Sequence, residues 1–479
     1  MNTSPESIAA DAVTSAVAQL TVAMDLSRIF DNAGYEIALV GGPVRDLIIG
    51  RPVKDFDFTT NAKPEEMVPF LESWADTVWD IGIEFGTVGV RKGDFIAEIT
   101  TYRSEIYDES SRKPVVAFGT DLADDLVRRD FTINAMAVRM PSLEFVDLYA
   151  GVSDLVKGLI RTPREAELSF SDDPLRMMRA ARFASQLGFT PVADVIIAAT
   201  QLADRLSIVS AERISDEFTK LLLGKHPVLG LEILEGTNLA EYFLPELPAL
   251  QLEIDEHHRH KDVYEHSLIV LTQAIDLENK HQPSCEPDLV LRLAALLHDI
   301  GKPKTRRFES GGGVSFHHHE VVGAKIARKR LTALRFPNDV IDDVCKLIEL
   351  HLRFHGYGQG QWTDSAVRRY VRDAGDQLIR LHKLTRADCT TRNQRRALIL
   401  AATYDDLEAR IEALSAQEEL NAIRPELDGN QIMEILGVPS GPMVGKAYKH
   451  LLNVRLDEGP LGYDEAVSRL KIWWESQNQ

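Results

Sequence analysis

Strand-like patterns stop near residue 150 of this 479-residue chain, and helical patterns fill the remainder. Before that point, short apolar runs of strand length alternate with helical pieces, as in α/β and α+β domains. Beyond it, apolar residues recur at helical spacing, with turn signals between the runs. The sequence therefore predicts an α+β fold, in which a head with a mixed sheet precedes an elongated, all-helical remainder.

The expected elements follow from apolar periodicity and from its breaks. A first helix is expected at 13–33, because Gly34 then ends the pattern. Strands are expected at 37–40, 56–60, 87–90, 95–101, 133–138 and 144–148. Later helices are expected at 173–187, 211–223, 262–275, 289–297, 321–331 and 339–350. The polar segment 104–120 interrupts the head and is expected to be a long mobile loop of functional importance.

The length exceeds one ordinary hydrophobic core, so several domains are expected. Proline-containing breaks at 246–255 and 281–288 interrupt the helical part. We divide the chain into an N-terminal extension with a helix start (1–25), a head (26–150), a helical neck (151–250), a second helical body (251–395) and a helical tail (396–479).

The formal net charge is −19, which excludes non-specific attraction of nucleic acid by the whole surface. The three cysteines show no CxxC spacing, so neither a disulfide partner nor a thiolate zinc site is expected. The first residues lack the basic and apolar blocks of a signal peptide. No apolar run approaches the roughly 20 residues that span a bilayer. We expect a cytoplasmic protein without a membrane partner.

Two aspartates in KDFDFTT (54–60) are spaced for one pocket. Residues two apart on a strand face the same side, so Asp55 and Asp57 would point together while Phe56 and Phe58 face the core. Paired carboxylates suit Mg²⁺, which takes oxygen ligands and keeps positions open for phosphate oxygens. On a neighbouring strand, Glu98 is the best-placed third carboxylate. Taken alone, DFD is also typical of a solvated strand end.

A glycine turn precedes this strand and is suited to an anion. Gly41 and Gly42 lie between an expected strand and the helical piece 44–49. Glycines there let a phosphate approach the backbone at a helix start, and Arg45 adds a guanidinium fork. Without the acidic strand beside it, the glycine pair is an ordinary turn.

GGPVRDLIIGRPVKDFDF (41–58) resembles the signature of the class II tRNA nucleotidyltransferase and bacterial poly(A) polymerase family. RRDFTINA (128–135), DDPLRMMRAARF (172–183) and SAERISDEFTK (210–220) resemble further motifs of this family, in its order. The resemblance covers nearly the whole chain. It implies a polymerase-beta-like head, Mg²⁺, and template-independent addition of CCA to the 3′ end of tRNA from CTP and ATP.

The resemblance also implies residue roles. Asp55, Asp57 and Glu98 would be catalytic, with the first two binding Mg²⁺. The nucleotide would be bound by Gly41, Gly42, Arg45, Arg128, Asp130, Asn134, Asp173, Arg176 and Arg179. The spacing of Asp173, Arg176 and Arg179 predicts one helix face, whose acceptor and donors match the edges of cytosine and adenine. An ordinary surface ion pair is the simpler interpretation of that spacing. Asp172 stands where the family usually has Glu, which puts a contact of that residue in doubt.

A second group of residues predicts a metal site in the helical body. His266, His298, Asp299, His319, His351 and Asp388 occur on successive expected helices and form a mixed nitrogen and oxygen ligand inventory. Each histidine alone is more typical of an ordinary helix residue. LLHDIGKPK (296–304), however, resembles the HD phosphohydrolase superfamily, which identifies 251–395 as an HD-type domain. The resemblance implies a transition metal (Ni²⁺, Mn²⁺, Co²⁺ or Fe²⁺) and hydrolysis of phosphate esters. FHHHEVVGA (316–324) selects His319 as the ligand, with His317 and His318 as bystanders.

Basic residues for RNA contact are expected in islands, because phosphate contacts need local charge only. The candidates are Arg161, Arg164 and Arg182 in the neck and Lys446 and Lys449 in the tail, with later islands at 367–372 and 391–397. A solvated helix face explains each island equally well. The tail segment 437–452 resembles the part of the family that grips the tRNA elbow.

Several alternatives stay open. Poly(A) polymerases and enzymes that add only CC or only A share these motifs, although the loop at 104–120 resembles the one that family members need to switch from C to A. A signalling or regulatory protein led by its HD domain is the alternative from another class. A non-catalytic RNA-binding module is disfavoured, because every expected carboxylate is present.

Overall fold

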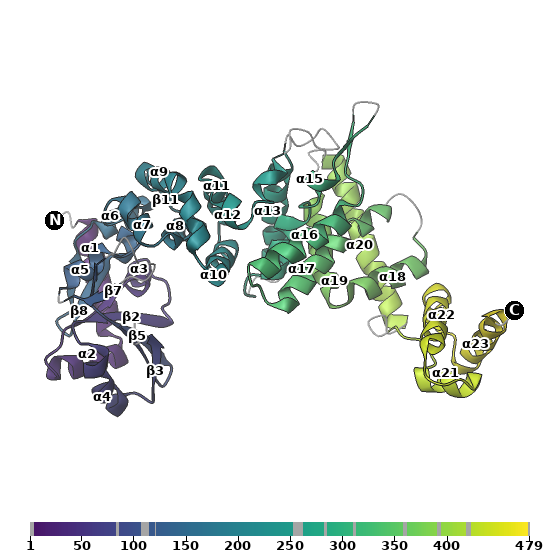
Figure 1. Cartoon of the computed structure of the whole chain (residues 1–479), viewed down its shortest axis with the longest axis horizontal. Coiled ribbons are helices and arrows are strands. Elements are labelled where there is room, and N and C mark those ends of the chain that lie inside the picture. The colour runs from purple at the N-terminus through teal and green to yellow at the C-terminus, as the bar shows by residue number, and fades with distance from the viewer. Residues whose placement is uncertain are drawn as a thin grey trace. The chain divides into compact units, whose positions relative to one another are not determined.

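The computed structural model describes residues 4–82, 86–106, 115–119, 121–251, 262–281, 285–309, 313–357, 362–389, 394–417 and 423–477. The chain forms two compact units, Met1–Phe243 and Leu244–Gln479 (Figure 1). The first holds the mixed sheet and the second is almost entirely helical. The predicted α+β class with a mixed head and a helical remainder is thereby confirmed. The finer division into five segments stays a prediction.

A seven-stranded sheet in the order β3-β4-β5-β2-β1-β8-β9 forms the centre of the head. The strands are β1 (Ile37–Val40), β2 (Asp55–Thr60), β3 (Thr77–Gly82), β4 (Thr87–Lys92), β5 (Phe95–Thr101), β8 (Met136–Met140) and β9 (Glu144–Asp147). Only the β2–β5 pair is parallel, and the other pairings in this sheet are antiparallel. The strand expected at 133–138 starts later, because Thr132–Asn134 form a 3₁₀ turn.

The segment at 104–120 is not wholly irregular. Its ends belong to β6 (Arg103–Ile106) and β7 (Val115–Phe118), which pair antiparallel with Ile106 opposite Val115. The predicted loop between them, at 107–114, lies outside the described residues, as does residue 120. The prediction of a long loop was therefore wrong at both ends, and its middle stays a prediction.

Two helices replace the single helix expected at 13–33: α1 (Pro5–Ala18) and α2 (Thr21–Asn32). Leu20 leaves the helical region with φ −79° and ψ 78°. Val13, Val17 and Leu26 are all buried in the same core cluster. The break therefore lets both helices bury their apolar faces against that core. No single described helix is long and apolar enough to cross a membrane, and α1 with α2 passes that test only as a pair bent by 87°.

Helices α3 (Gly42–Ile48), α4 (Pro64–Trp74) and α5 (Leu122–Val127) complete the head. The neck contains α6 (Gly151–Lys157), α7 (Ala166–Asp172), α8 (Leu175–Leu187), α9 (Ala193–Gln201), α10 (Ala211–Leu222), α11 (Pro227–Gly236), α12 (Ala240–Phe243) and the short parallel pair of β10 (Leu159–Ile160) and β11 (Thr190–Pro191). The helix expected at 173–187 begins only at Leu175. Pro174 disfavours a helical conformation of the residue before it, and Asp173 accordingly has φ −138° and ψ 99°.

The second unit contains α13 (Val263–His281), α14 (Leu289–Leu297), α15 (Lys302–Thr305), α16 (His319–Ala333), α17 (Asn338–Leu350), α18 (Asp364–Ala374), α19 (Leu378–Asp388) and α20 (Gln394–Gln417). The hairpin of β12 (Arg307–Phe308) and β13 (Val314–Ser315) precedes α16. Helix α14 is buried from Val290 to Leu297 and contacts α13, α17 and α19. Residues at its C-terminal end are therefore placed in the middle of the helical bundle.

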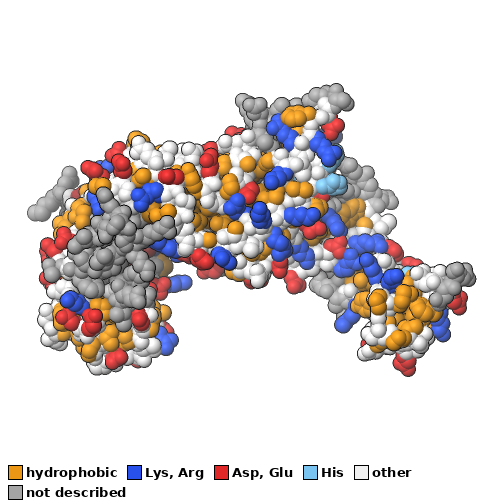
Figure 2. Space-filling model, in the orientation of Figure 1, with side chains coloured by type: hydrophobic (Ala, Val, Ile, Leu, Met, Phe, Trp, Pro, Cys, Tyr) orange, Lys and Arg blue, Asp and Glu red, His pale blue; other side chains and the backbone are white. Residues whose placement is uncertain are grey.

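The chain ends in the three-helix tail, formed by α21 (Gly429–Leu436), α22 (Pro442–Glu458) and α23 (Tyr463–Gln477). It has its own core, in which Ile432, Leu451 and Leu470 are fully buried. On the face shown in Figure 2, Lys and Arg side chains lie among Asp and Glu side chains over the helical part of the molecule. Basic side chains are therefore present at the surface although the net charge of the chain is negative.

Candidate active site and metal centre

The acidic strand of the head has the predicted alternation. Phe56 and Phe58 are buried, whereas Asp55 and Asp57 lie on the opposite, accessible face of β2. In the parallel pairing of β2 with β5, Asp57 is directly opposite Glu98. The tertiary structure thus places the three predicted carboxylates on neighbouring strands of one sheet.

These carboxylates repel one another electrostatically. Although Asp57 keeps accessible surface, surrounding protein raises its pKa, with Asp55 adding to the rise and Arg129 opposing it. Burial raises the pKa of Glu98 too, followed by the charges of Asp57 and Asp55. A divalent cation would relieve this repulsion, and an all-oxygen donor set suits Mg²⁺. Among the described residues, clusters whose ligand atoms all lie within 4.8 Å of one another occur in the second unit. The case for Mg²⁺ in the head therefore rests on the chemistry of its three carboxylates, and not on ligand atoms that already surround one point.

Beside the carboxylates, Gly41 allows a close approach of the backbone. Its φ of +75° favours glycine, and a Cβ there would lie 3.0 Å from Arg129 Nη1 and 3.7 Å from Asp57 Oδ2. The neighbouring guanidinium of Arg45 is buried and engaged, since it donates to both Asp46 oxygens at 3.0 Å and to Asn134 Oδ1 at 2.7 Å. The guanidinium of Arg45, which we predicted to bind phosphate, therefore already donates to protein oxygens.

A buried aspartate forms ion pairs with both arginines of the RRDFTINA motif. The Asp125 side chain is fully buried, and its oxygens accept from Arg128 Nη2 at 2.9 Å and from Arg129 Nη2 at 3.0 Å. Burial alone would raise the pKa of Asp125, but Arg129 and Arg128 lower it below its usual value. We did not predict roles for Asp125 and Arg129. The spacing of an acid three and four residues before two arginines was the signal for them.

The predicted base-reading residues do not share one helix face. Asp173 lies outside α8 and pairs with Arg213 Nη2 at 3.2 Å. Arg176 donates to Ser169 Oγ at 2.8 Å and to the Arg128 carbonyl oxygen at 2.5 Å. The prediction of a common face was wrong, because Pro174 delays the start of the helix. Helix α8 nevertheless lies against the RRDFTINA motif.

A chain of contacts joins α8 to the glycine turn. Arg179 Nη2 lies 2.6 Å from Asp130 Oδ2. Asp130 Oδ1 accepts from Asn134 Nδ2 at 3.0 Å, and Asn134 in turn accepts from Arg45. All four are predicted nucleotide-binding residues. Their roles stay predictions, but the structure brings them together.

The basic candidates for RNA contact differ in accessibility. Arg161 is 45% exposed beside Asp154, and Arg164 pairs with Asp172, the residue that stands in place of the usual Glu. Lys446 and Lys449 are exposed on α22. Of the later islands, Arg368 is buried and donates to the Leu456 carbonyl oxygen, and residues 391–393 lie outside the described residues.

The position of Arg182 in the structure contradicts its predicted role as an RNA contact. Its guanidinium is 4.4 Å from the Phe183 ring centre, and both Arg182 and its partner Glu217 are buried, with their side chains 3.2 Å apart. Its position on the inner face of an amphipathic helix explains the error, because a charge count does not show which face is buried.

Replacing Arg182 should therefore affect stability. We expect Arg182→Ala to lower the free energy of unfolding by about 3 kcal/mol, because it leaves Glu217 buried and unpaired. The Arg28→Ala variant, in which the arginine and its partner Asp25 are both exposed, should lose less than about 1 kcal/mol. Urea denaturation of both variants would test this. A stable Arg182→Ala protein with weakened tRNA binding would instead restore the predicted RNA contact.

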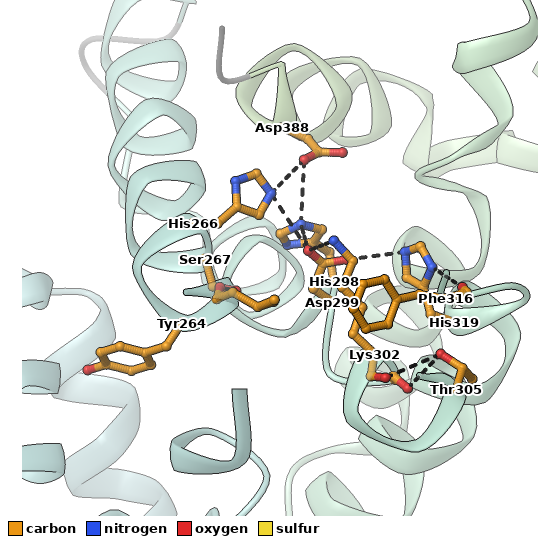
Figure 3. A network of polar contacts seen from close by, with 12 residues as sticks. Tyr264, His266, Ser267, His298, Asp299, Lys302, Thr305, Phe316, His319 and Asp388 are labelled. Carbon is orange, nitrogen blue, oxygen red and sulfur yellow. Dashed lines mark hydrogen bonds and ion pairs between the residues drawn. The ribbon is translucent and has the colours of Figure 1, made fainter. Parts of the chain in front are cut away.

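The second unit holds the six predicted metal ligands in two adjoining groups, which we together call the HD-type cluster: one is formed by His266, His298 and Asp388, and the other by Asp299, His319 and His351. Figure 3 labels all of them except His351. His266 Nε2 lies 3.0 Å from Asp388 Oδ1. Asp299 lies between two histidines, with Oδ2 3.1 Å from His298 Nε2 and Oδ1 3.2 Å from His319 Nε2. His317 and His318 are exposed, which agrees with their predicted role as bystanders.

Backbone carbonyls orient three of these histidines. The Nδ1 atoms of His298, His319 and His351 lie 2.9, 2.8 and 2.6 Å from the carbonyl oxygens three residues earlier. Their Nε2 atoms are buried within the cluster, where those of His298 and His319 lie beside the Asp299 oxygens. An Nδ1–H held in this way directs the Nε2 lone pair to a metal. The cluster therefore fits a divalent transition metal with mixed nitrogen and oxygen ligands.

Two glycines let the ligand-bearing segments meet. A Cβ at Gly301, in the HDIGKP turn, would clash with the His319 carbonyl oxygen, and Gly323 packs against the same turn. Lys302, which we did not predict, is also buried there, with Nζ 2.9 Å from Asp299 Oδ2. Its position three residues after Asp299 was the available signal.

Burial and neighbouring charges shift the pKa values of several residues in the cluster. Burial lowers the pKa of His298, but Asp299 and Asp388 outweigh burial and raise that pKa to about 10. Burial, with His298 nearby, lowers the pKa of His351 to about 3. Burial opposes ionisation of Asp299, yet His298 and Lys302 hold its pKa well below the usual value. In the metal-free cluster His298 is therefore protonated at neutral pH, and a divalent metal would displace this proton, because a ligating imidazole is neutral.

Three family models match the chain. Residues 37–161 match the poly A polymerase head domain, 188–250 the probable RNA and SrmB-binding site of polymerase A, and 263–393 the HD domain. These matches confirm the resemblances that the motifs indicated.

Curated relatives are similar in sequence to part of the chain. A CCA-adding enzyme of Lactiplantibacillus plantarum is 42% identical over 231 residues, which cover 48% of this chain and 56% of the relative. One of Leuconostoc mesenteroides is 44% identical over 204 residues, covering 42% and 50%. The chain spans about half the length of the curated relatives it matches.

Solved structures share the fold over nearly the whole chain. The CCA-adding enzyme of Bacillus stearothermophilus in complex with CTP has a TM-score of 0.70 at 24% identity, covering 96% of this chain and 98% of that one. The Thermotoga maritima CCA-adding enzyme complexed with tRNA has a TM-score of 0.59 at 18% identity, covering 94% of both chains. The predicted fold class agrees with these structures.

Proposed function

We propose that this chain, with its poly A polymerase head domain and HD domain, adds CCA to the 3′ end of tRNA from CTP and ATP. One observation carries the proposal: Asp55 and Asp57 share the accessible face of β2, with Glu98 opposite Asp57 on the parallel strand β5. This places oxygen ligands beside a glycine turn that a phosphate can approach. The relatives named CCA-adding enzymes support the same reaction.

In this proposal, Asp55, Asp57 and Glu98 hold Mg²⁺, which supplies charge neutralisation and activates the 3′ hydroxyl when bound. The 3′ oxygen of the tRNA forms the new bond to the α-phosphorus of the nucleotide, and the bond to pyrophosphate breaks. Arg129, beside Gly41, and Arg128 bind the triphosphate. Side chains do little proton transfer, because positioning and electrostatics carry most of a phosphoryl-type transfer.

We assign the selection of C and A to Arg176 on α8 and to Asp173, which lies two residues before that helix. Arg176 and Asp173 offer donors and an acceptor on either side of Pro174, close to the RRDFTINA motif. Both are engaged with protein groups, so an incoming base would replace at least the exposed contact between Asp173 and Arg213. The tRNA is the proposed partner, with Lys446 and Lys449 as phosphate contacts whose binding weakens as salt rises.

The test uses tRNAs that end before CCA, after C and after CC. Each is incubated with single nucleotides and with CTP plus ATP, and the 3′ ends are sequenced. Addition of CCA followed by arrest supports the proposal. A long A tail indicates a poly(A) polymerase, and addition limited to CC or A indicates a partial enzyme. No incorporation would favour the HD-led regulatory alternative.

Asp125 provides a prediction for the nucleotide site. We expect Asp125→Asn to lower kcat/KM for nucleotide addition by about 10²-fold, because a small displacement of positioning groups has effects of this size. The control is Asp124→Asn, an exposed acid next to it on α5, which should stay within about twofold of the parent. Steady-state kinetics with CTP would measure both. Equal values for a folded Asp125→Asn variant would show that Asp125 does not position the arginines.

A second activity is proposed for the HD-type cluster, because its six ligands converge and three Nε2 atoms face inward. The cluster would bind Ni²⁺, Mn²⁺, Co²⁺ or Fe²⁺, which supplies a nucleophilic water when bound. Its proposed substrates are phosphate esters of RNA ends, such as 2′-phosphates and 2′,3′-cyclic phosphates. Purified protein loaded with each metal would be assayed on these substrates, and absence of hydrolysis with all of them would indicate a structural domain.

A further inference from the structure

Three residues, Thr132, Asp154 and Arg161, form a closed ring of hydrogen bonds at the start of the 3₁₀ turn Thr132–Asn134, and we call them the Thr132 ring. Thr132 Oγ1 donates to Asp154 Oδ2 at 2.8 Å in a buried contact. Arg161 Nε donates to the same oxygen at 3.2 Å. The carbonyl oxygen of Arg161 accepts from the backbone N–H of Thr132 at 2.7 Å. The first residue of the turn is therefore held through both its side chain and its backbone.

Asp154 reaches the turn because α6 lies close against it. A Cβ on Gly151, the first residue of α6, would clash with the Thr132 carbonyl oxygen. Ala150, just before the helix, has a left-handed conformation with φ 58°, which is strained for a residue other than glycine. The Asp147 carboxylate accepts from the first two backbone N–H groups of α6 at 2.7 and 2.9 Å. Strain of this kind persists only where the surrounding contacts enforce it, and it is concentrated at functional sites.

The last residue of the same turn carries contacts of the predicted nucleotide site. Asn134 Oδ1 accepts from Arg45 Nη1 at 2.7 Å, and Asn134 Nδ2 donates to Asp130 Oδ1 at 3.0 Å. Asp130 also pairs with Arg179. Because three residues make one turn of a 3₁₀ helix, a displacement of Thr132 is passed on to Asn134. The Thr132 ring therefore lies one turn away from the groups that would contact the nucleotide.

We propose that Asp154 is a positioning residue for nucleotide addition, which acts through Thr132 on the orientation of the Asn134 amide and of the groups bonded to it. The inference rests on the proposed nucleotidyl transfer and adds to it a residue that binds neither the nucleotide nor the metal. It also gives Arg161, predicted as an RNA contact, a different role, since its side chain and its carbonyl oxygen both belong to the ring. Loss of the ring should therefore affect the nucleotide more than the tRNA.

The test removes one hydroxyl while keeping the size of the side chain. In Thr132→Val we expect kcat/KM for CTP to fall at least about tenfold with a higher KM for CTP, because small displacements of positioning groups have effects of this size. KM for a tRNA that lacks CCA should stay within about twofold of the parent, since distant groups act independently. Thr132→Ser keeps the hydroxyl and should restore the KM for CTP. The matched control is Thr332→Val, at an exposed position on α16, which should equal the parent.

The two KM values separate positioning from a purely structural role. Loss of folded protein lowers the apparent kcat and leaves both KM values unchanged, and this result in Thr132→Val would contradict the inference. Arg161→Ala, which removes a side chain that is 45% exposed, is the second variant if Thr132→Val does not fold. A higher KM for CTP in Arg161→Ala supports the inference. A higher KM for tRNA alone would instead restore the predicted RNA contact.

A double-mutant cycle tests whether Asp154 acts through Thr132. Asp154→Ala alone should lower kcat/KM for CTP about as much as Thr132→Val does. Added to Thr132→Val, it should lower kcat/KM by less than about twofold more, because residues in one hydrogen-bond network are not additive. Full additivity of the two changes would overturn the inference.

Calorimetric titration with CTP and Mg²⁺ gives a readout that does not depend on transfer to tRNA. If the parent binds CTP but extends no tRNA, the proposed function fails, and weaker CTP binding by Thr132→Val than by Thr332→Val still supports the inference. Equal CTP binding by the parent and by folded Thr132→Val would overturn it. Absence of CTP binding by the parent would overturn both proposals.

Discussion

Asp57→Ala should reduce nucleotide incorporation by at least about 10³-fold, because a metal-held charge contributes several kcal/mol to such a transition state. The protein should stay folded. Asp57 lies on the accessible face of β2, and its raised pKa shows that its charge is unfavourable where it is. Removing it therefore relieves repulsion with Asp55 and Glu98. Incorporation of labelled CTP in Mg²⁺ and a thermal melt of the same sample would measure both effects.

Asp94→Ala is the matched control, since Asp94 is an exposed acid in the turn that leads into β5. It should retain activity within about twofold of the parent, as is usual for an exposed surface change. Asp55→Ala should behave like Asp57→Ala. Near-normal CTP addition by either variant would remove the nucleotidyl-transfer assignment. A loss of activity that accompanies unfolding would say nothing of the metal, so the melt is read first.

The double variant His298→Ala, Asp299→Ala should lose the transition metal and every hydrolytic activity of the body. Asp299 lies between His298 and His319, so both halves of the HD-type cluster lose a ligand. Metal affinity should fall by more than about 100-fold, because changes to outer partners alone cost 10- to 100-fold. Elemental analysis after dialysis would report the bound metal. The proposed nucleotide addition should stay within about twofold, since the head carboxylates and the HD-type cluster share no residue and belong to separate compact units.

His317→Ala is the control for this variant, because His317 is exposed and only two residues from His319. It should keep the metal and the hydrolysis. Retention of stoichiometric metal by the double variant would show that the ion is bound elsewhere. If the double variant loses nucleotide addition together with hydrolysis, the two sites do not act independently.

Local chemistry accounts for what could be predicted from the sequence. The alternation of Asp55, Phe56, Asp57 and Phe58 follows from the two-residue period of a strand, and the structure has it. The ligands of the HD-type cluster could be named because HDIGKP and FHHHEVVGA resemble known motifs. Pro174 is also a local signal, because it disfavours a helical conformation of Asp173, and the structure has Asp173 outside the helix.

Other errors came from packing. Arg182 is one of several arginines on α8, and its sequence neighbourhood does not show that it faces Glu217 in the interior. The break between α1 and α2 follows from the core that both helices cover, which no local signal in 13–33 indicates. For Arg45 the sequence did not show that Asp46 and the distant Asn134 accept from its guanidinium, and its role in nucleotide binding stays a prediction.

The sequence by itself determined the strand that carries Asp55 and Asp57, the change from mixed to helical structure, and the identities of the metal-ligand side chains. These depend on periodicity and on residue chemistry within a few positions. Only the tertiary structure decided that Glu98 stands opposite Asp57, that Asp125 holds two arginines, and that Asp299 lies between His298 and His319. Such features depend on strand register and on helix packing between residues far apart in the chain, and burial, not local propensity, determines both.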